Sequence, residues 1–286
     1  MVAGEAGGHS GMAAAPDWVL DLCREWGLEC GDEGSWVVSG QGCDGLVMPV
    51  RRGSERCVLR VAWPAGKIAV EARALEAWDG RGAVRLLAAR PEVGALLLER
   101  LDAERSLERI PLSEAAEVAG RLLRRLAIPA PAGVPCLREL AADIEASLPE
   151  RQQRLAQPIP PRWVDAAQSL ARELGAAAGR LLVHADLHYG NVLAGEREPW
   201  LAIDPKPVAG DPEFAVPEML WSRLDEADGA TGLRRLLSAL VDGAGLDASR
   251  ARGWAIVRCV DYWLWGLENG LTEDPQRCRR ILDVLA

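Results

Sequence analysis

One short segment of the chain concentrates residues that can do chemistry. The run HADLHYGN, from His184 to Asn191, holds two histidines, an aspartate and an asparagine, and Asp204 follows in the apolar setting LAIDP. These residue types and spacings suit phosphoryl transfer. One aspartate, Asp186, orients an attacking hydroxyl and accepts its proton, while Asn191 and Asp204 bind the magnesium ions that bridge nucleotide phosphates.

The interval from Asp186 to Asn191, D-x-x-x-x-N, equals that of a kinase catalytic loop. Two other interpretations remain open. His184, Asp186 and His188 are spaced two residues apart, so on an extended strand they would lie on one face and could bind a metal. This pattern is typical of a zinc or iron metallohydrolase, although His9 is then the only further histidine. Alternatively, the histidines support the loop through hydrogen bonds and Asp186 forms a turn. For the histidines individually we favour this structural role, because phosphoryl transfer needs neither.

The elements that must position this loop fall into two parts that differ in their predicted secondary structure. Residues 1–15 are a loose Gly/Ala-rich tail without the basic leader and apolar run of a signal peptide. Residues 16–100 predict an N-terminal lobe, with helices at Asp17–Gly27 and Lys67–Trp78. Its β-prone runs, separated by turn signals, form a predicted five-stranded antiparallel sheet: Trp36–Ser39, Leu46–Val50, Cys57–Ala62, Ala83–Leu87 and Ala95–Leu98.

Residues 101–286 predict a larger and mainly helical C-terminal lobe. Long Ala/Leu/Arg/Glu segments with helical periodicity run through it: Ser113–Leu126, Leu137–Leu155, Pro161–Ala178, Leu233–Val241, Arg252–Leu267 and Pro275–Leu285. The exception is Leu181–Asp204, where short β-prone pieces surround the polar loop. The predicted class is therefore α+β, with a small antiparallel-sheet lobe that carries one main helix and a helical lobe that carries the chemistry.

Composition restricts the kinds of partner. The 286 residues carry a formal charge of -9, the wrong sign for a protein that neutralises many phosphates, so we expect no nucleic acid. An acidic chain suits a cationic partner, although solubility alone is the commoner reason for such a charge. The seven cysteines form no C-x-x-C pair and indicate a reducing compartment. Without a stretch that could span a bilayer, we expect a cytoplasmic protein that does not bind membranes, with a monomer favoured.

The segment LLVHADLHYGNVLAGEREPWLAIDPKPVAGDPEF resembles the signature region of the aminoglycoside phosphotransferase superfamily, and specifically its streptomycin 6-phosphotransferase and hydroxyurea phosphotransferase branch. Weaker similarity extends through EARALEAWDGRGAVRLL, LLLERL and RARGWAIVRCVDYWLWGLENGL. The resemblance implies a protein-kinase-like bilobal fold and an ATP- and Mg²⁺-dependent O-phosphotransferase that inactivates an antibiotic.

Carried over by position, the resemblance assigns Asp186 as the catalytic base and Asn191 and Asp204 as magnesium ligands. It places adenine against the backbone from Glu99 to Leu101.

The resemblance also places Gly40 and Gly42, in the loop Ser39–Gly45, over the phosphates, although the same loop is equally consistent with a plain hairpin turn. Arg60 departs from the family pattern, since the family usually has a lysine here that contacts the α- and β-phosphates and pairs with a helix glutamate, here Glu71. Arginine keeps the charge but presents a planar fork, so the exchange is not conservative. We expect a working enzyme, with a nucleotide-binding pseudokinase as the alternative.

The acceptor is expected to bind beyond the second metal aspartate. Residues 204–228 hold seven acids and two bases, a net of -7 + 2 = -5, which would steer a polycation. A solvated helix face explains any single acid equally well. The candidate acceptor residues there are Asp211, Glu218, Asp225 and Glu226, of which Asp211 is also expected to support the catalytic loop.

Asp261, Trp265 and Glu268 fall at i, i+4 and i+7 of the apolar segment Arg252–Asn269 and add a polar and aromatic stripe. There a guanidinium or ammonium group could pair with the acids and lie over Trp265, or Asp261 could simply bond to Arg258 or a loop. The expected partner is a cationic small-molecule antibiotic of the streptomycin type. A basic cyclic peptide antibiotic of the capreomycin or viomycin type is the alternative, whereas hydroxyurea would not need the acids.

Overall fold

A computed structural model of the chain describes residues 17–30, 37–38, 44–63 and 66–286. The predicted tail 1–15 and the glycines Gly40 and Gly42 lie outside the described residues. The chain divides into two compact units. The first holds the described residues up to Ala72 together with Val84–Arg100, and the second holds Arg73–Ala83 and Leu101–Ala286.

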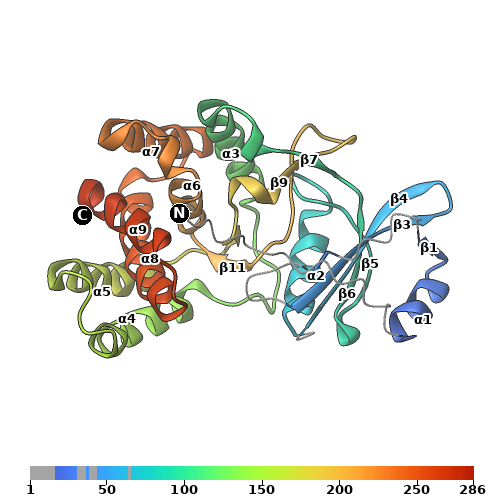
Figure 1. The fold of residues 1–286 in the computed structure, drawn as a ribbon, viewed down its shortest axis with the longest axis horizontal. Helices are drawn as coiled ribbons and strands as arrows, with labels where there is room; N and C mark the ends of the chain where they lie inside the picture. The colour runs from blue at the N-terminus through green and yellow to red at the C-terminus, as the bar shows by residue number, and fades with distance from the viewer. Residues whose placement is uncertain (1–16, 31–36, 39–43, 64–65) are drawn as a thin grey trace, which may run out of the picture. The chain divides into compact units, whose positions relative to one another are not determined.

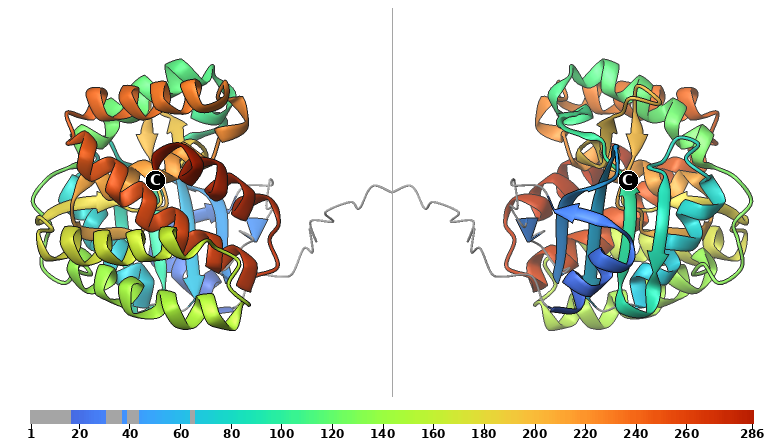
Figure 2. Two further views of the ribbon diagram at one scale, coloured as in Figure 1. Left: turned by 90° about the vertical axis from the view of Figure 1, so that its left-hand side faces the viewer. Right: turned by 90° about the vertical axis from the view of Figure 1, so that its right-hand side faces the viewer.

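The first unit is built on an antiparallel sheet in the order β1-β3-β4-β6-β5, with β2 paired to β3. Figure 2 shows these strands side by side in its right-hand view. Their bounds are β1 Leu28–Cys30, β2 Val37–Val38, β3 Asp44–Arg52, β4 Glu55–Trp63, β5 Leu86–Arg90 and β6 Ala95–Glu99. Helix α1 (Asp17–Glu25) packs on the sheet, because the alternating residues Cys57, Leu59 and Val61 of β4 form a core with apolar residues of α1.

Two features of this sheet differ from the prediction. The three-residue strand β1, which pairs with the end of β3, was not expected. The strand predicted at Ala83–Leu87 begins instead at Leu86, because Gly82 has a φ of +75° and its carbonyl accepts a bond from Ala202 N–H. Gly82 and Ala83 belong to the second unit, whereas Val84 and the residues up to Arg100 belong to the first. Helix α2 (Gly66–Trp78) contributes to both units.

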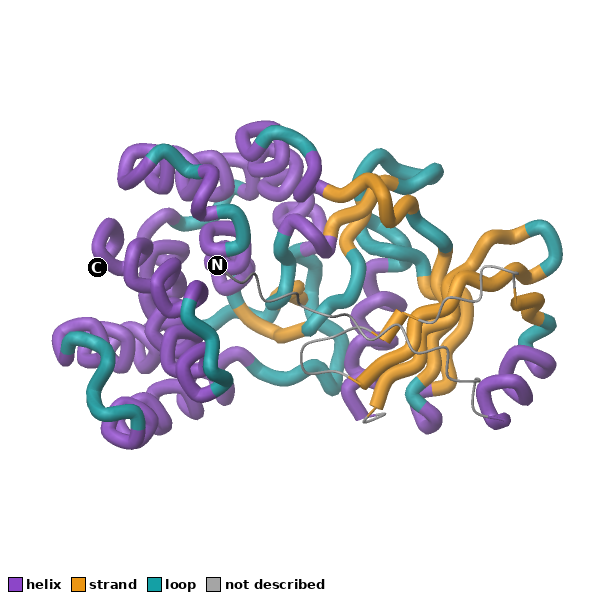
Figure 3. The backbone as a smooth tube through the Cα atoms, viewed as in Figure 1, coloured by secondary structure: helices purple, strands orange, loops and turns teal. Residues whose placement is uncertain are grey.

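The second unit is mainly helical, as predicted, with short strands around the polar loop (Figure 3). Its helices are α3 Leu112–Leu126, α4 Leu137–Arg154, α5 Pro161–Ala176, α6 Val216–Trp221, α7 Gly229–Ala244, α8 Ala248–Glu268 and α9 Glu273–Leu285. Its strands are β7 Asp102–Ser106, β8 Leu181–His184, β9 Val192–Ala194, β10 Leu201–Ala202 and β11 Pro207–Gly210.

Helix α8 is the central helix of this unit. It is buried along most of its length, and Trp254 has no exposed surface. Figure 1 shows it beside α9, and α5 packs on it where Gly253 faces Leu174. A Cβ at Gly253 would lie 2.8 Å from Leu174 Cδ1, so this glycine permits the close approach. No helix in the described ranges is long and apolar enough to cross a membrane.

Candidate active site

Two short antiparallel ladders hold the polar loop. Strands β8 and β11 pair with His184 opposite Pro207, so the loop leaves β8 beside the start of β11. Strands β9 and β10 pair with Val192 opposite Ala202, and Ile203 N–H donates to Asn191 C=O at 2.9 Å. The second ladder therefore places Asn191 level with the residue that precedes Asp204. Local strand pairing brings together the loop and the second aspartate.

Asp186 lies at the centre of these bonds. Its carbonyl accepts from the Asn191 amide nitrogen at 2.9 Å and from His188 N–H at 3.0 Å. Its carboxylate Oδ2 lies 2.7 Å from Lys206 Nζ, and 19% of its side chain is exposed. The carboxylate is thus accessible, fixed by its backbone and next to a cation, which suits a base that must be ionised to accept a proton.

His184 holds the polar loop in position. It is buried and stacks on Trp78 with the ring centroids 6.2 Å apart. Its Nδ1 accepts from Asp186 N–H at 3.3 Å, so Nε2 carries the proton and donates to Ile203 C=O at 2.9 Å. Burial lowers the pKa of His184 below its usual value, which keeps the ring neutral.

The metallohydrolase interpretation is wrong. Both ring nitrogens of His184 are used within the protein, and His188 Nδ1 accepts from Gly190 N–H at 3.1 Å. Within the described ranges, no group of three or more His, Cys, Asp and Glu side chains could hold a metal ion. The structural interpretation of the histidines explains these contacts.

Asn191 and Asp204 nevertheless fit a hard cation such as Mg²⁺. The Asn191 amide nitrogen is used by the Asp186 carbonyl, so the amide oxygen is the end that can serve as a ligand. Asp204 has a φ of +51°, a left-handed conformation held directly before Pro205. Such a conformation costs about 1–3 kcal/mol in a non-glycine residue and is concentrated at functional sites.

In the first unit, the predicted partner of Arg60 is found. Arg60 on β4 forms an ion pair with Glu71 on α2, and both side chains are largely buried. Glu99 ends β6, where its N–H donates to Arg85 C=O at 3.0 Å and its carboxylate accepts from Arg85 N–H at 2.7 Å. Contact of the backbone from Glu99 to Leu101 with adenine stays a prediction.

Four of the seven acids of residues 204–228 are paired with arginines: Asp211, Glu218, Asp225 and Glu226. Asp211 is buried, pairs with Arg250 and accepts bonds from Gly179 N–H at 2.8 Å and Trp254 Nε1–H at 3.0 Å. It therefore fixes β11 to α8, and this geometry matches the expected supporting role.

Glu218 is also buried. It lies 2.5 Å from Arg258 and accepts from Trp221 Nε1–H at 2.9 Å. Burial raises its pKa above the usual value of a glutamate. The Arg258 guanidinium donates in addition to the Ala185 carbonyl at 3.1 Å, next to Asp186. Glu218 and Arg258 thus connect α6 and α8 to the catalytic loop.

The other two candidate acceptor acids have arginine partners too. Asp225 pairs with Arg277 and Arg280, and Glu226 pairs with Arg223 at 2.6 Å. The net charge of -5 counted along residues 204–228 therefore overstates the local charge, because arginines from α8 and α9 lie against it. The sequence count missed them because they are distant in the chain.

The three predicted residues of α8 are all at least partly exposed. Trp265 is 41% exposed and stacks on Tyr262 at 5.3 Å between centroids, and Tyr262 stacks on Trp221 at 4.7 Å. Asp261 and Glu268 pair with Arg151 of α4, so Asp261 does not bond to Arg258. Their carboxylate side chains remain 32% and 23% exposed. Tyr262 and Lys206 were not singled out from the sequence, although Lys206 is one of only two lysines.

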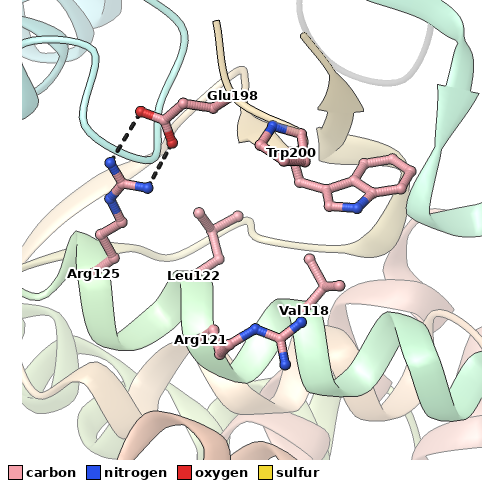
Figure 4. A pocket seen from close by; sticks show the side chains of 7 residues that line it. Val118, Arg121, Leu122, Arg125, Glu198 and Trp200 are labelled. Carbon is pink, nitrogen blue, oxygen red and sulfur yellow. Dashed lines mark hydrogen bonds and ion pairs between the residues drawn. The ribbon is translucent and has the colours of Figure 1, made fainter.

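A pocket of about 390 Å³ lies elsewhere in the second unit, between α3 and the turn that joins β9 to β10. Val118, Leu122 and Trp200 line it, and Arg125 forms a two-bond ion pair with Glu198 at its edge (Figure 4). None of the predicted site residues is among those that line it.

Sequence comparison identifies relatives of the whole chain. Residues 36–270 match the family described as aminoglycoside/hydroxyurea antibiotic resistance kinase. The chain belongs to this family. It is 42% identical to the hydroxyurea phosphotransferase of Kitasatospora aureofaciens over 99% of this chain and 82% of the relative. It is 39% identical to the streptomycin 6-kinase of Streptomyces glaucescens over 92% of this chain and 86% of the relative.

The fold of this antibiotic kinase is also found in solved structures. Aminoglycoside phosphotransferase APH(4)-Ia, solved with ADP and hygromycin B, matches with a TM-score of 0.64 and 15% identity over 93% of this chain and 97% of that one. Choline kinase LicA from Streptococcus pneumoniae matches with a TM-score of 0.61 and 14% identity over 94% and 99%. The predicted α+β kinase-like fold is confirmed, and the chain is an antibiotic phosphotransferase by family.

Proposed function

We propose that this protein transfers the γ-phosphoryl group of ATP to a hydroxyl of a cationic aminoglycoside of the streptomycin type. The main support is that hydrogen bonds bring the three residues together. The Asn191 amide bonds to the Asp186 carbonyl, and the residue before Asp204 bonds to the Asn191 carbonyl. That arrangement supplies a base and two oxygen ligands within a loop that several backbone hydrogen bonds hold in place.

Different residues have different roles in the proposed phosphoryl transfer. Asp186 accepts the proton of the acceptor hydroxyl, and its fixed backbone orients the carboxylate toward the attacking oxygen. Asn191 and Asp204 are the residues that would hold Mg²⁺, which supplies charge neutralisation at the phosphate oxygens when bound. His184 keeps the loop and the Asp204 segment at a fixed separation, because it bonds to both.

Arg60, paired with Glu71, takes the role of the phosphate-binding lysine in this proposal. A guanidinium is always charged and can donate two bonds to one phosphate. The backbone from Glu99 to Leu101 and the glycines Gly40 and Gly42 remain the proposed nucleotide contacts.

The proposed acceptor surface is the stripe around Trp265. Its exposed ring lies at the end of a stack that continues through Tyr262 to Trp221, and Trp221 bonds to Glu218. A cationic group lying over an aromatic face gains about 1–2 kcal/mol when it is desolvated. Asp261 and Glu268 lie on the same helix and are partly exposed, and their pairing with Arg151 offsets part of their negative charge. Asp225 and Glu226 stay proposed contacts at the edge.

Phosphorylation of hydroxyurea is a second candidate. The 42% identity to a hydroxyurea phosphotransferase supports it, and so does the pairing of the acids with arginines, which reduces the charge available to a polycation. A basic cyclic peptide antibiotic of the capreomycin or viomycin type is the remaining cationic alternative.

A panel of acceptors distinguishes these candidates. The protein is incubated with ATP, Mg²⁺ and, separately, streptomycin, hydroxyurea and capreomycin, and each product is examined by mass spectrometry. We expect streptomycin to gain one phosphate, and Trp265→Ala to raise its KM while leaving the KM for ATP unchanged. A product from hydroxyurea alone assigns the second candidate. If ATP binds but no acceptor gains phosphate, the protein is a pseudokinase.

A further inference from the structure

Lys206 has a fixed backbone beside the catalytic loop. Its carbonyl accepts from Ala185 N–H at 3.0 Å, one step beyond the ladder between β8 and β11. Pro205 and Pro207 flank it, and proline disfavours a right-handed helical backbone in the residue before it. The backbone of Lys206 is therefore held beside the loop that carries Asp186.

The ammonium group is placed on the catalytic base. Nζ lies 2.7 Å from Asp186 Oδ2, and 65% of the lysine side chain is exposed. An ion pair in which the lysine is this exposed to solvent contributes little to folding. Stability of the fold does not explain why the pair is there.

The type of residue is informative as well. Of 33 basic side chains in the chain, 31 are arginines, and Lys206 and Lys67 are the two lysines. A lysine ammonium is a compact charge whose three N–H groups can bond to a carboxylate and a second anion together. An arginine here would present a planar fork that occupies the carboxylate with two bonds.

We propose that Lys206 is a catalytic residue whose ammonium contacts an oxygen of the transferring phosphoryl group. This inference rests on the proposed function. Asp186 holds the acceptor hydroxyl at roughly 2.6–3.2 Å, and the reacting phosphorus approaches that oxygen to about 3–3.5 Å. A group already bonded to the carboxylate therefore reaches the phosphoryl oxygens by a small rotation of its side chain.

Lys206 keeps all its protons during the phosphoryl transfer. The bond from the acceptor oxygen to the γ-phosphorus forms as the bond from that phosphorus to the bridging oxygen of the nucleotide breaks. The electron pair of the broken bond stays on the departing diphosphate, and the acceptor proton goes to Asp186. Lys206 stabilises the negative charge on the phosphoryl oxygens throughout.

The first test is affinity labelling without an acceptor. An ATP analogue with an acyl group on its γ-phosphate acylates amines that lie against the phosphates, and peptide mass mapping identifies the lysine. We expect Lys206 to be acylated and to be protected by excess ATP, while labelling of Lys67, exposed on α2, is not protected. Absence of label on Lys206, or labelling that ATP does not reduce, overturns the inference.

The second test is kinetic. With the acceptor found in the panel, Lys206→Ala should lower kcat on the order of 100-fold and leave both KM values within about threefold. Lys206→Arg should recover part of the rate, and Lys67→Ala is the matched control with unchanged kcat. A kcat of Lys206→Ala within about twofold of the unaltered enzyme overturns the inference.

Failure of the inference and failure of the proposed function differ in their readouts. If the unaltered protein phosphorylates an acceptor and Lys206→Ala does so at the same rate, the inference alone is wrong. If the unaltered protein phosphorylates nothing, the proposed function is wrong, and the inference falls with it. Unfolding curves of both variants show that a lost rate reflects chemistry and not a lost fold.

Discussion

Arg60 stands where the family resemblance predicts a lysine. It is paired with Glu71 inside the first unit, and this ion pair holds the guanidinium in the position from which it would bind phosphate. Charge-assisted bonds of this kind contribute about 1.5–3 kcal/mol. Arg60→Ala should therefore raise the KM for ATP by roughly 10- to 100-fold or abolish turnover, and Arg60→Lys should retain more activity. An unchanged KM in Arg60→Ala would show that Arg60 does not bind the nucleotide.

His184 makes the stability of the protein dependent on pH. Its folded pKa lies below the ordinary value of about 6.5 because the ring is buried. The unfolded chain therefore binds more protons below that value, and stability falls as pH decreases. Between pH 7.5 and 5.5 this loss amounts to at most about 1.4 kcal/mol.

The variant His184→Gln tests this assignment. Glutamine can still donate to the Ile203 carbonyl but does not titrate. We expect the free energy of unfolding, measured with urea, to be lower than in the unaltered protein at pH 7.5 but to change less between pH 7.5 and 5.5. An equal change in both proteins would assign the acid sensitivity to other groups.

Helix α8 supports the catalytic loop through Arg258. Its guanidinium donates to the carbonyls of Ala185 and Phe214, pairs with Glu218 and lies over the rings of Phe214 and Trp221. Arg258 is thus the side chain of α8 that donates a hydrogen bond to the Ala185 carbonyl, directly before Asp186. Arg258 is a positioning residue.

Replacing Arg258 by methionine should destabilise the fold by about 3 kcal/mol, because Glu218 is left buried without its cation. The double variant Glu218→Gln with Arg258→Met should recover stability but not kcat, since the Ala185 carbonyl still lacks its donor. Urea unfolding and kcat measured on both variants check this. Recovery of kcat along with stability would show that Arg258 acts on the fold alone.

The catalytic loop was predictable because its signal is local. Asp186, Asn191 and Asp204 lie close together in sequence, and two short β-prone pieces are enough to position them. The start of β5 was predicted too early, because Gly82 and Ala83 bond to Ala202, and no local pattern indicates that contact.

The arginine partners of the acids were not predictable in the same way. Asp211 and Arg250 are 39 residues apart, Glu218 and Arg258 are 40 apart, and Arg151 and Asp261 are 110 apart. Which of the 31 arginines meets which acid is decided by helix packing. A charge count along the sequence therefore predicts an acidic region where the structure has ion pairs.

Across the protein, this pairing changes the meaning of the net charge of -9. Acids near the catalytic loop are neutralised in place, so long-range steering of a polycation is weaker than the sequence suggests. If the proposed function holds, recognition of a cationic acceptor depends mainly on the exposed ring of Trp265. The salt dependence of acceptor KM should accordingly be modest.

Asp186 is the residue on which the proposed direct transfer from ATP depends most, as its base. The decisive measurement compares the unaltered protein with Asp186→Asn in the rate of phosphate gain by the acceptor, with ATP binding followed by thermal shift. We expect kcat to fall on the order of 10²- to 10⁴-fold while the ATP-induced shift in Tm is preserved. A variant that transfers phosphate at the rate of the unaltered protein would contradict the assignment of the active site.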